Sequence, residues 1–536
     1  MSDFLKLYFP AQRRLAKGTL ALAAVCIAGC GSNYRPTTTP ITPTGPAAQP
    51  TSYAFVVSAP SPATANGIGT LIDYSGDTVM VSAQIGPGPS MFALNAGGSS
   101  AWTVNSDSTI SNIPVSTNLQ EKNVYFTTLN TDPVVAFFSG AFGEYALDVQ
   151  ANQVDVLNGS PAASLKVVIP VDPSPVTMVG VGTVQRYYAV TQTIPYLKQM
   201  TLDGQQVQGG IACNIDAHSA DLASFGGFAD GIETSSNTVS SHIAVGVCPD
   251  YAVQTPDNRR VFVLNRGSDT VSVINSQINA SDSCTPFKNQ NGQLVTCYPT
   301  LPLSTAAVKA LCPTPAAATC ILPPNESSAN LPAVAGPVYA EYNQATSQLV
   351  VANYEGNTIN IIDVSQDEYG NDSSTFGTTY TVPVGHNPAS VTVLADGSRA
   401  YVANQSDSTV TIVNLISHTV EKTLPVYGHP RTVVSTQNSL YGKVYVASPD
   451  SPYVTLIRTD QDIVDTTVLV QGNTVDVKIT SPDALNNNMN TVSRLPGAGQ
   501  PCNLPLSDLP ASAITVANCK VQDATQLATP TVAKRR

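Results

Sequence analysis

The hydrophobic residues of this 536-residue chain fall into short runs rather than long stripes. From Tyr53 onward, runs rich in Val, Ile, Thr and Tyr are separated by Gly, Asn, Asp and Pro. No long stretch repeats its apolar positions with the period of a helix. Short β-branched and aromatic runs between turn residues are typical of strands. The pattern therefore predicts an all-β fold over residues 53–480.

One of these patterns recurs along the chain as a hairpin. Each copy consists of a strand ending in Asn, a polar turn, and a second strand beginning with Thr. The copies are segments 261–275, 350–363 and 401–414, and 102–110 is a fainter one. An Asn side chain can bond to the turn backbone, and Asn, Asp or Gly tolerates the bend. We interpret the repeated Asn as a turn residue rather than a ligand at Asn105, Asn265, Asn353 and Asn404.

A proline marks the start of another short strand before each hairpin. These markers are Pro89, Pro133, Pro175, Pro249, Pro337, Pro388 and Pro430. Several of the spacings between them are 42 or 44 residues, which matches a four-stranded propeller blade of about 40–50 residues. The longer spacings predict insertions at 209–238, 276–330 and 367–377.

The markers also predict how many blades there are and how the ring closes. Seven prolines and a proline-free start at Gly472 give a single β-propeller of eight four-stranded blades. Residues 53–85 hold three predicted strands without an innermost one, and the strand at 475–479 has no hairpin after it. Pairing of these N- and C-terminal strands would complete one blade and remove exposed sheet edges. Seven blades is the alternative, if one weakly repeated early block is not a blade.

The chain resembles the YVTN-repeat, lactonase-like β-propeller family in three features. These are the Tyr-Val-Ala-Asn hairpin at 401–404, the Thr-Val-Thr-Ile-Val-Asn strand that follows it, and the Gly-x-x-Pro lead-in. The similarity is strong over about 260–470 and weak over 53–200. The family typically closes seven blades, so a count of eight departs from it. The resemblance implies a lactonase-like hydrolase as one possible function, but no catalytic residue of the family maps onto this sequence. The one Trp disfavours a WD40 ring.

The N-terminus reads as an export signal. Residues 1–29 combine a basic region with an apolar stretch, 18–29, that is too short to span a bilayer. The small residues before Cys30 resemble the lipobox of bacterial lipoproteins, which implies that Cys30 is lipidated and anchors the chain to a membrane. By the same resemblance, Ser32 at the second position after this cysteine permits sorting of the lipoprotein to the outer membrane. A plain secretory signal or a soluble N-terminus is the alternative.

Composition agrees with an exported, tethered protein. Residues 30–52 are rich in Thr and Pro and predict an extended linker. The net charge of −12 argues against a nucleic-acid partner. The cysteines outside the signal region form neighbouring pairs that suit local disulfides, although their connectivity is open. The candidates are Cys213, Cys248, Cys284, Cys297, Cys312, Cys320, Cys502 and Cys519.

Candidate chemistry is sparse. The sequence contains no HExxH, GxSxG or Walker motif. His386 and His429 are equivalent positions of adjacent repeats, so with Arg431 they are candidate ligand-binding residues at the mouth of the central channel. The alternative is that the imidazoles cap loop backbone. The acidic segment 363–372 offers oxygen ligands but fits no EF-hand spacing, so we interpret it as a solvated loop.

These observations favour a binding or protein-interaction scaffold in the cell envelope over the hydrolase. We expect a monomer that binds a protein or small-molecule ligand, without a catalytic residue, metal or cofactor that the sequence identifies. Residues 481–536 lack the repeat and are interpreted as a C-terminal extension closed by a disulfide, followed by a tail.

Overall fold

The computed structural model describes residues 53–480, apart from short gaps at 62–63, 74–75, 96–97, 129–133, 141–142, 159–163, 285, 289–291, 293, 315–321, 325–329, 368–369 and 437–441. The predicted signal peptide, linker and C-terminal extension lie outside the described residues, as do Cys30, Cys320, Cys502 and Cys519. Within the described part, no helix combines the length and apolar character needed to cross a bilayer.

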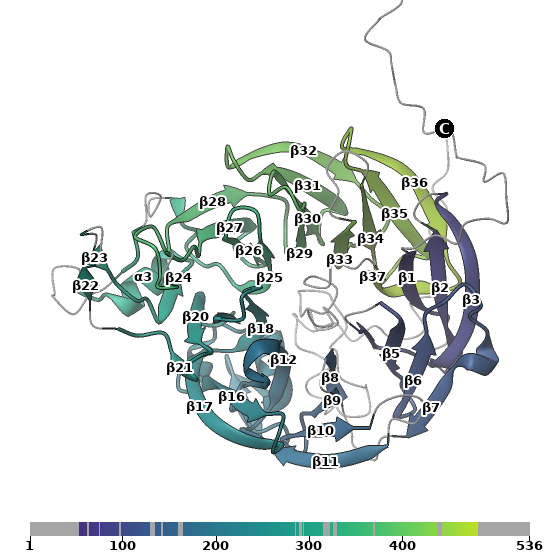
Figure 1. Cartoon of the computed structure of the whole chain (residues 1–536), viewed down its shortest axis with the longest axis horizontal. Helices are drawn as coiled ribbons and strands as arrows, with labels where there is room; N and C mark the ends of the chain where they lie inside the picture. The colour runs from purple at the N-terminus through teal and green to yellow at the C-terminus, as the bar shows by residue number, and fades with distance from the viewer. Residues whose placement is uncertain are drawn as a thin grey trace, which may run out of the picture. The chain divides into compact units, whose positions relative to one another are not determined.

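The described chain forms an eight-bladed β-propeller of antiparallel sheets, as the eight-blade count predicts (Figure 1). The seven-blade alternative is wrong. Blade 1 joins β37 (Asn473–Ile479) to β1 (Tyr53–Ala59), β2 (Asn66–Asp73) and β3 (Thr78–Pro87). Blade 2 contains β4 (Met91–Leu94), β5 (Ser100–Val104), β6 (Thr109–Pro114) and β7 (Tyr125–Thr128). Blade 3 contains β8 (Val134–Gly140), β9 (Gly143–Asp148), β10 (Gln153–Leu157) and β11 (Leu165–Pro170). Blade 4 contains β12 (Pro175–Val181), β13 (Arg186–Thr191), β16 (Gly226–Glu233) and β17 (Thr238–Val247).

The second half of the ring repeats this order. Blade 5 contains β18 (Pro249–Gln254), β19 (Arg260–Asn265) and β20 (Thr270–Asn275), and two short strands, β21 (Ala280–Ser281) and β24 (Thr300–Pro302), share its outer position. Blade 6 contains β25 (Pro337–Asn343), β26 (Gln348–Asn353), β27 (Thr358–Asp363) and β28 (Thr379–Pro383). Blade 7 contains β29 (Pro388–Val393), β30 (Arg399–Asn404), β31 (Thr409–Asn414) and β32 (Thr419–Pro425). Blade 8 contains β33 (Thr432–Ser435), β34 (Lys443–Ala447), β35 (Tyr453–Arg458) and β36 (Ile463–Leu469).

The ring is closed by pairing of the first and last described strands. β1 pairs antiparallel with β37, in a register that places Val56 opposite Val477. The Tyr53 backbone N–H also donates to Thr480 Oγ1 at 2.7 Å. This confirms the predicted closure, and each inner strand contacts the inner strand of the next blade around the ring. Closure matters because, without this pairing, β1 and β37 would each expose an additional unpaired strand edge.

In blades 2, 5, 6 and 7 the hairpin is held by a buried Asn, as predicted for a turn residue. In blade 5, Asn265 Nδ2 donates to Thr270 Oγ1 at 3.1 Å and to Ser272 Oγ at 2.9 Å. Its Oδ1 accepts from the Gly246 backbone at 2.9 Å. A Cβ at Gly246 would lie 2.7 Å from Asn265 Cγ, which explains why Gly precedes the proline marker. The residue before the hairpin Thr adopts positive φ, for example Asp269 at 54°.

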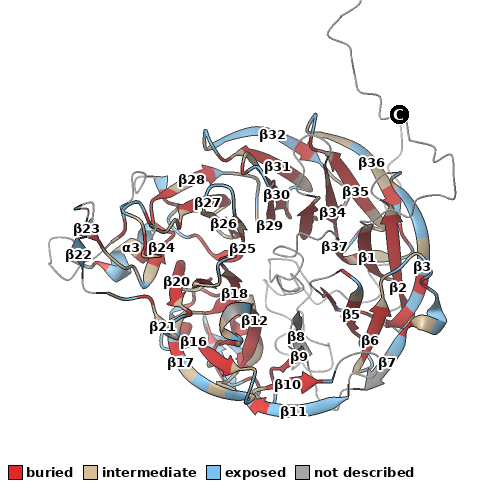
Figure 2. Cartoon of the chain, viewed as in Figure 1, coloured by how far each residue is buried: buried red, intermediate tan, exposed pale blue. Residues whose placement is uncertain are grey.

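Aromatic residues three positions before the hairpin Asn, or before the residue equivalent to it, fill the space between blades. Burying such a side chain contributes roughly 1.5–3 kcal/mol. Figure 2 shows the inner strands mostly buried and the outermost strands, such as β11 and β32, largely exposed. The fully buried aromatics at this position include Trp102, Tyr145, Tyr188, Phe262, Tyr401 and Tyr445.

The insertions occur near the predicted places, with one shifted boundary. In blade 4 the inserted segment is 192–225, not 209–238, because 226–233 and 238–247 are regular blade strands. This insertion contains β14 (Gln199–Leu202), β15 (Gln205–Gln208), α2 (Ala212–Ile215) and the 3₁₀ turns η3 (Gly209–Ile211) and η4 (Ala220–Leu222). The remaining short elements are β22 (Phe287–Lys288), β23 (Leu294–Val295), α3 (Thr305–Leu311), η1 (Glu121–Asn123) and η2 (Gly182–Val184).

Candidate functional site

One face of the ring carries both the hairpin turns and the loops that lead into the inner strands. In an antiparallel blade the second strand ends beside the start of the first, as Asn404 does opposite Pro388. We call this side the hairpin face. The turn between the third and fourth strands, such as 415–418, lies at the opposite end of the blade. The predicted candidates His386 and His429 belong to the hairpin face.

Each of these two histidines is bound by an aspartate from the hairpin turn of its own blade. His386 Nδ1 lies 2.8 Å from Asp407 Oδ1, and its backbone N–H donates to Asp407 Oδ2 at 2.7 Å. His429 repeats the arrangement with Asp450, at 2.5 Å from Nδ1 and 2.7 Å from the backbone N–H. Neither aspartate was predicted from the sequence. An acidic residue two or three positions after the hairpin Asn position was the available signal.

Each of the two His–Asp pairs is joined by two contacts but is open to solvent. The side chains of His386 and His429 are 69% and 54% exposed. Burial raises the pKa of Asp407, but the hydrogen bonds from the backbone and ring of His386 outweigh it and lower the pKa overall. When a carboxylate holds Nδ1, Nε2 is the ring nitrogen left to bind a partner. Neither imidazole belongs to a cluster of three potential metal ligands within the described residues.

A third, partly buried pair lies on the same face. His218 Nε2, from the blade 4 insertion, lies 2.8 Å from Asp269 Oδ1 in the blade 5 hairpin turn. Asp269 also accepts from the Gly336 backbone at 2.7 Å. Burial lowers the pKa of His218, but the hydrogen bond and charge of Asp269 raise it overall. The pair therefore fastens the insertion to blades 5 and 6.

The prediction that Arg431 lies beside the two imidazoles as a ligand-binding residue is wrong, because its side chain is buried. It is 8% exposed, and its Nη2 donates to the Val475 carbonyl of β37 at 2.6 Å. Burial lowers the pKa of the guanidinium, and the charge of Asp476 opposes that shift. Arg431 therefore connects blade 8 to the strand that closes the ring.

The residue after the hairpin Asn position connects neighbouring blades on this face. Gln192 Nε2 donates to the Pro249 carbonyl at 3.1 Å. Arg266 forms an ion pair with Glu355 of the next blade and lies over the Tyr354 ring. These side chains are buried, so we interpret them as structural contacts rather than ligand groups.

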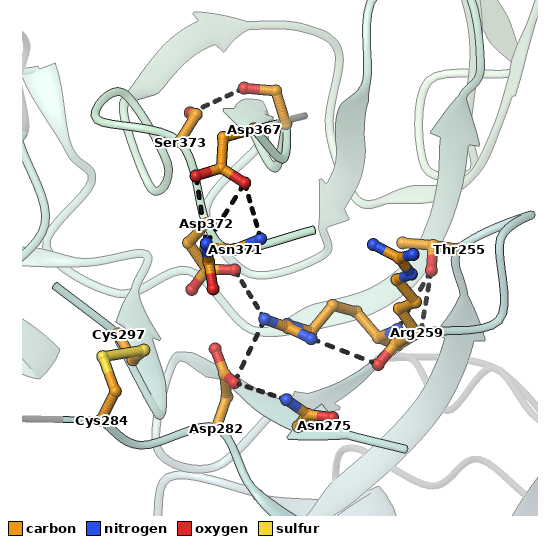
Figure 3. Close-up of polar contacts among 12 residues, drawn as sticks. Thr255, Arg259, Asn275, Asp282, Cys284, Cys297, Asp367, Asn371, Asp372 and Ser373 are labelled. Atoms are coloured by element: carbon orange, nitrogen blue, oxygen red, sulfur yellow. Dashed lines mark hydrogen bonds and ion pairs between the residues drawn. A yellow bond between two sulfur atoms is a disulfide. The ribbon is translucent and has the colours of Figure 1, made fainter. Parts of the chain in front are cut away.

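The acidic segment between β27 and β28 is not simply a solvated loop. Asp372 is fully buried and accepts from Arg260 Nη2 of blade 5 at 3.0 Å, and Asp282 lies 3.4 Å from the same nitrogen (Figure 3). Burial and the neighbouring Asp282 raise the pKa of Asp372 to about 7. Cys297, the nearby sulfur, is in a disulfide, so it offers no thiolate for a metal.

The disulfide predictions are confirmed where the structure describes both cysteines. Cys213 bonds to Cys248, and Cys284 bonds to Cys297. Cys312 is also disulfide-bonded, while its predicted partner Cys320 lies outside the described residues. The Cys502–Cys519 pair lies outside them as well and stays a prediction.

Comparison with known proteins relates this chain to others by fold. No family model matches the sequence, and no curated protein matches it. Among solved structures, AztD from Citrobacter koseri superposes with a TM-score of 0.50 at 9% identity, over 80% of this chain and 97% of AztD. A protein from Bacteroides fragilis, whose name proposes a 6-phosphogluconolactonase activity, superposes with a TM-score of 0.45 at 12% identity. The superposition covers 81% of this chain and 99% of that protein. At these identities the likeness concerns the β-propeller fold alone.

Proposed function

We propose that this chain is a lipid-anchored, extracytoplasmic binding scaffold whose partner contacts the hairpin face at blades 7 and 8. The observation that supports this is the pair of exposed His–Asp units at equivalent positions of adjacent blades. Each imidazole is fixed through Nδ1 and through its backbone. A side chain that is ordered before binding loses less entropy when a partner binds it.

An aromatic residue beside the second unit extends the surface. Tyr427 is 55% exposed and packs on Tyr453 with ring centroids 5.1 Å apart. Tyr and His combine apolar area with a hydrogen-bonding tip, and exposed Tyr is enriched in binding sites. His386, His429 and Tyr427 are thus the residues that we assign to partner contact.

The binding proposal is tested by the double variant His386→Ala/His429→Ala. In the anchored protein, a photo-crosslinking residue at Tyr427 should capture a defined envelope partner, and the double variant should reduce capture at least about tenfold, corresponding to about 1.4 kcal/mol. Ile416→Ala is the control, because Ile416 is 73% exposed on the opposite face. Equal capture by all three proteins would contradict the proposed surface.

A lactonase-like hydrolase is the second candidate. A histidine that acts as a general base is often oriented by a carboxylate at Nδ1, as His386 and His429 are here. Assays of the purified protein against lactones separate the two. Hydrolysis that disappears in the double variant would favour the enzyme. Partner capture without hydrolysis would favour the scaffold.

The anchor is a separate part of the proposal. The basic and apolar signal, the small residues before Cys30 and the Thr/Pro-rich linker support it. The two disulfides with both cysteines described suit an oxidising compartment. Replacing Cys30 by Ala should move the protein from the membrane to the soluble fraction. Retention of the variant in the membrane would rule out lipidation as the anchor.

A further inference from the structure

We infer that Asp172, Asp230 and His242 form a binding site for a divalent transition-metal ion, with Zn²⁺ as the best-matched ion. The three residues lie at the junction of blades 3 and 4, with Asp172 in the loop that leads into β12 on the hairpin face. These blades do not carry the partner surface proposed at blades 7 and 8. The inference is therefore independent of the proposed partner surface.

The ligand atoms converge from two neighbouring strands and a connection. Asp230 on β16 and His242 on β17 are directly opposite each other in the sheet register. Asp172 comes from the connection between β11 and β12. His242 Nδ1 lies 2.8 Å from Asp230 Oδ1 and 3.0 Å from Asp172 Oδ2. One ligand atom from each residue lies within 4.8 Å of the others.

A backbone contact holds the Asp230 carboxylate in this arrangement. The Asp172 N–H donates to Asp230 Oδ2 at 2.7 Å, which leaves Asp230 Oδ1 facing the imidazole. A tetrahedral Zn²⁺ with N and O ligands at about 2.0–2.2 Å would hold ligand atoms about 3.3 Å apart. The two distances from His242 Nδ1 are therefore shorter than this separation by about 0.3 and about 0.5 Å.

The charge balance also favours a cation. Asp230 is fully buried, and Asp172 and His242 both contact its carboxylate directly. A divalent ion would neutralise the two carboxylates, which a single imidazolium only partly balances.

His242 differs from three other histidines in the number of carboxylates that it contacts. His218, His386 and His429 each lie within hydrogen-bonding distance of one carboxylate, whereas His242 contacts two. Two oxygens and one imidazole nitrogen suit Zn²⁺ better than Mg²⁺ or Ca²⁺, which prefer oxygen alone. The half-exposed imidazole, 57% accessible, leaves room for water as the fourth ligand.

The test is calorimetric titration of the purified mature protein, stripped of metal, with Zn²⁺. Wild type should bind one equivalent at this site. His242→Ala and Asp172→Asn should each weaken that binding at least about 100-fold, which corresponds to about 2.7 kcal/mol. The control His386→Ala/His429→Ala should leave this binding unchanged.

A second readout guards against misfolded variants. His242→Gln preserves a hydrogen bond to the carboxylates and should keep the fold while losing the visible absorption of bound Co²⁺. The assignment is overturned if wild type binds no Zn²⁺ or Co²⁺, if it binds Ca²⁺ only, or if His242→Ala binds Zn²⁺ like wild type. Loss of binding in the His386/His429 control alone would move the metal to the paired histidines of blades 7 and 8.

Discussion

At the scale of single residues, the hairpin Asn determines the local structure. Asn265 uses both atoms of its amide, because Nδ2 donates to two hydroxyls and Oδ1 accepts from the preceding lead-in loop. One buried side chain thereby connects the turn, the third strand and the start of the blade. The same Asn in blades 2, 6 and 7 donates to a Thr and to a second polar side chain on the third strand.

Replacing this residue should be costly. Asn265→Ala leaves the Gly246 N–H and two hydroxyls without their partner in a buried site, so the free energy of unfolding should fall by about 2–3 kcal/mol. Denaturant unfolding followed by circular dichroism measures this. Gln277→Ala, an exposed amide in another turn of blade 5, should change stability by less than about 0.5 kcal/mol. Equal effects of the two substitutions would refute the role given to Asn265.

The buried Asp372 predicts a pH dependence of stability. Its pKa of about 7 in the folded protein exceeds the value of about 3.9 in an unfolded chain. The native carboxyl thus keeps its proton to higher pH, and this contribution to stability is full below about pH 4 and lost as pH rises through about 7. Asp372→Asn should therefore reduce the loss of unfolding free energy between about pH 5 and pH 8 by about 1–3 kcal/mol. An unchanged pH profile would show that Arg260 keeps Asp372 ionised.

At the scale of elements, the blades are regular and the insertions are fastened to them individually. The blade 4 insertion is held by the disulfide from Cys213 to Cys248 and by the pair of His218 with Asp269. The longer insertion after β20 replaces one outer strand of blade 5 by two short ones. Long connections thus add surface without disturbing the inner strands.

The disulfide of blade 4 should act locally as well as on overall stability. Cys213→Ser/Cys248→Ser opens a loop of 35 residues and should lower the free energy of unfolding by about 2–4 kcal/mol. Hydrogen exchange should rise in residues 212–225. Cys284→Ser/Cys297→Ser is the control, because it should leave exchange in that segment unchanged. Protection of 212–225 that survives the first double substitution would mean that side-chain contacts alone hold the insertion.

At the scale of the whole molecule, the sequence was enough to predict the ring, its blade number and its closure. These features depend on a local repeat, since the hairpins of blades 2, 5 and 7 each carry their own Asn, Thr and aromatic residue. Side-chain pairing was harder to predict. Arg260 and Asp372 are 112 residues apart, and Asp172 and His242 are 70 apart, so no short motif joins them. His386 was identified by its repeat position, but its partner Asp407 depends on the turn conformation.

The central claim is that the ends of the described chain meet in one blade. Val56 and Val477 are opposite each other in the β1–β37 register, and both are fully buried. The most direct measurement is therefore disulfide formation in Val56→Cys/Val477→Cys, with Val56→Cys/Ile479→Cys as the control displaced by two residues. The closed ring predicts an intramolecular bond between positions 56 and 477 in the monomer, seen by peptide mass mapping, and much less bonding in the control. Free thiols at both positions, or bonds only between molecules, would contradict closure.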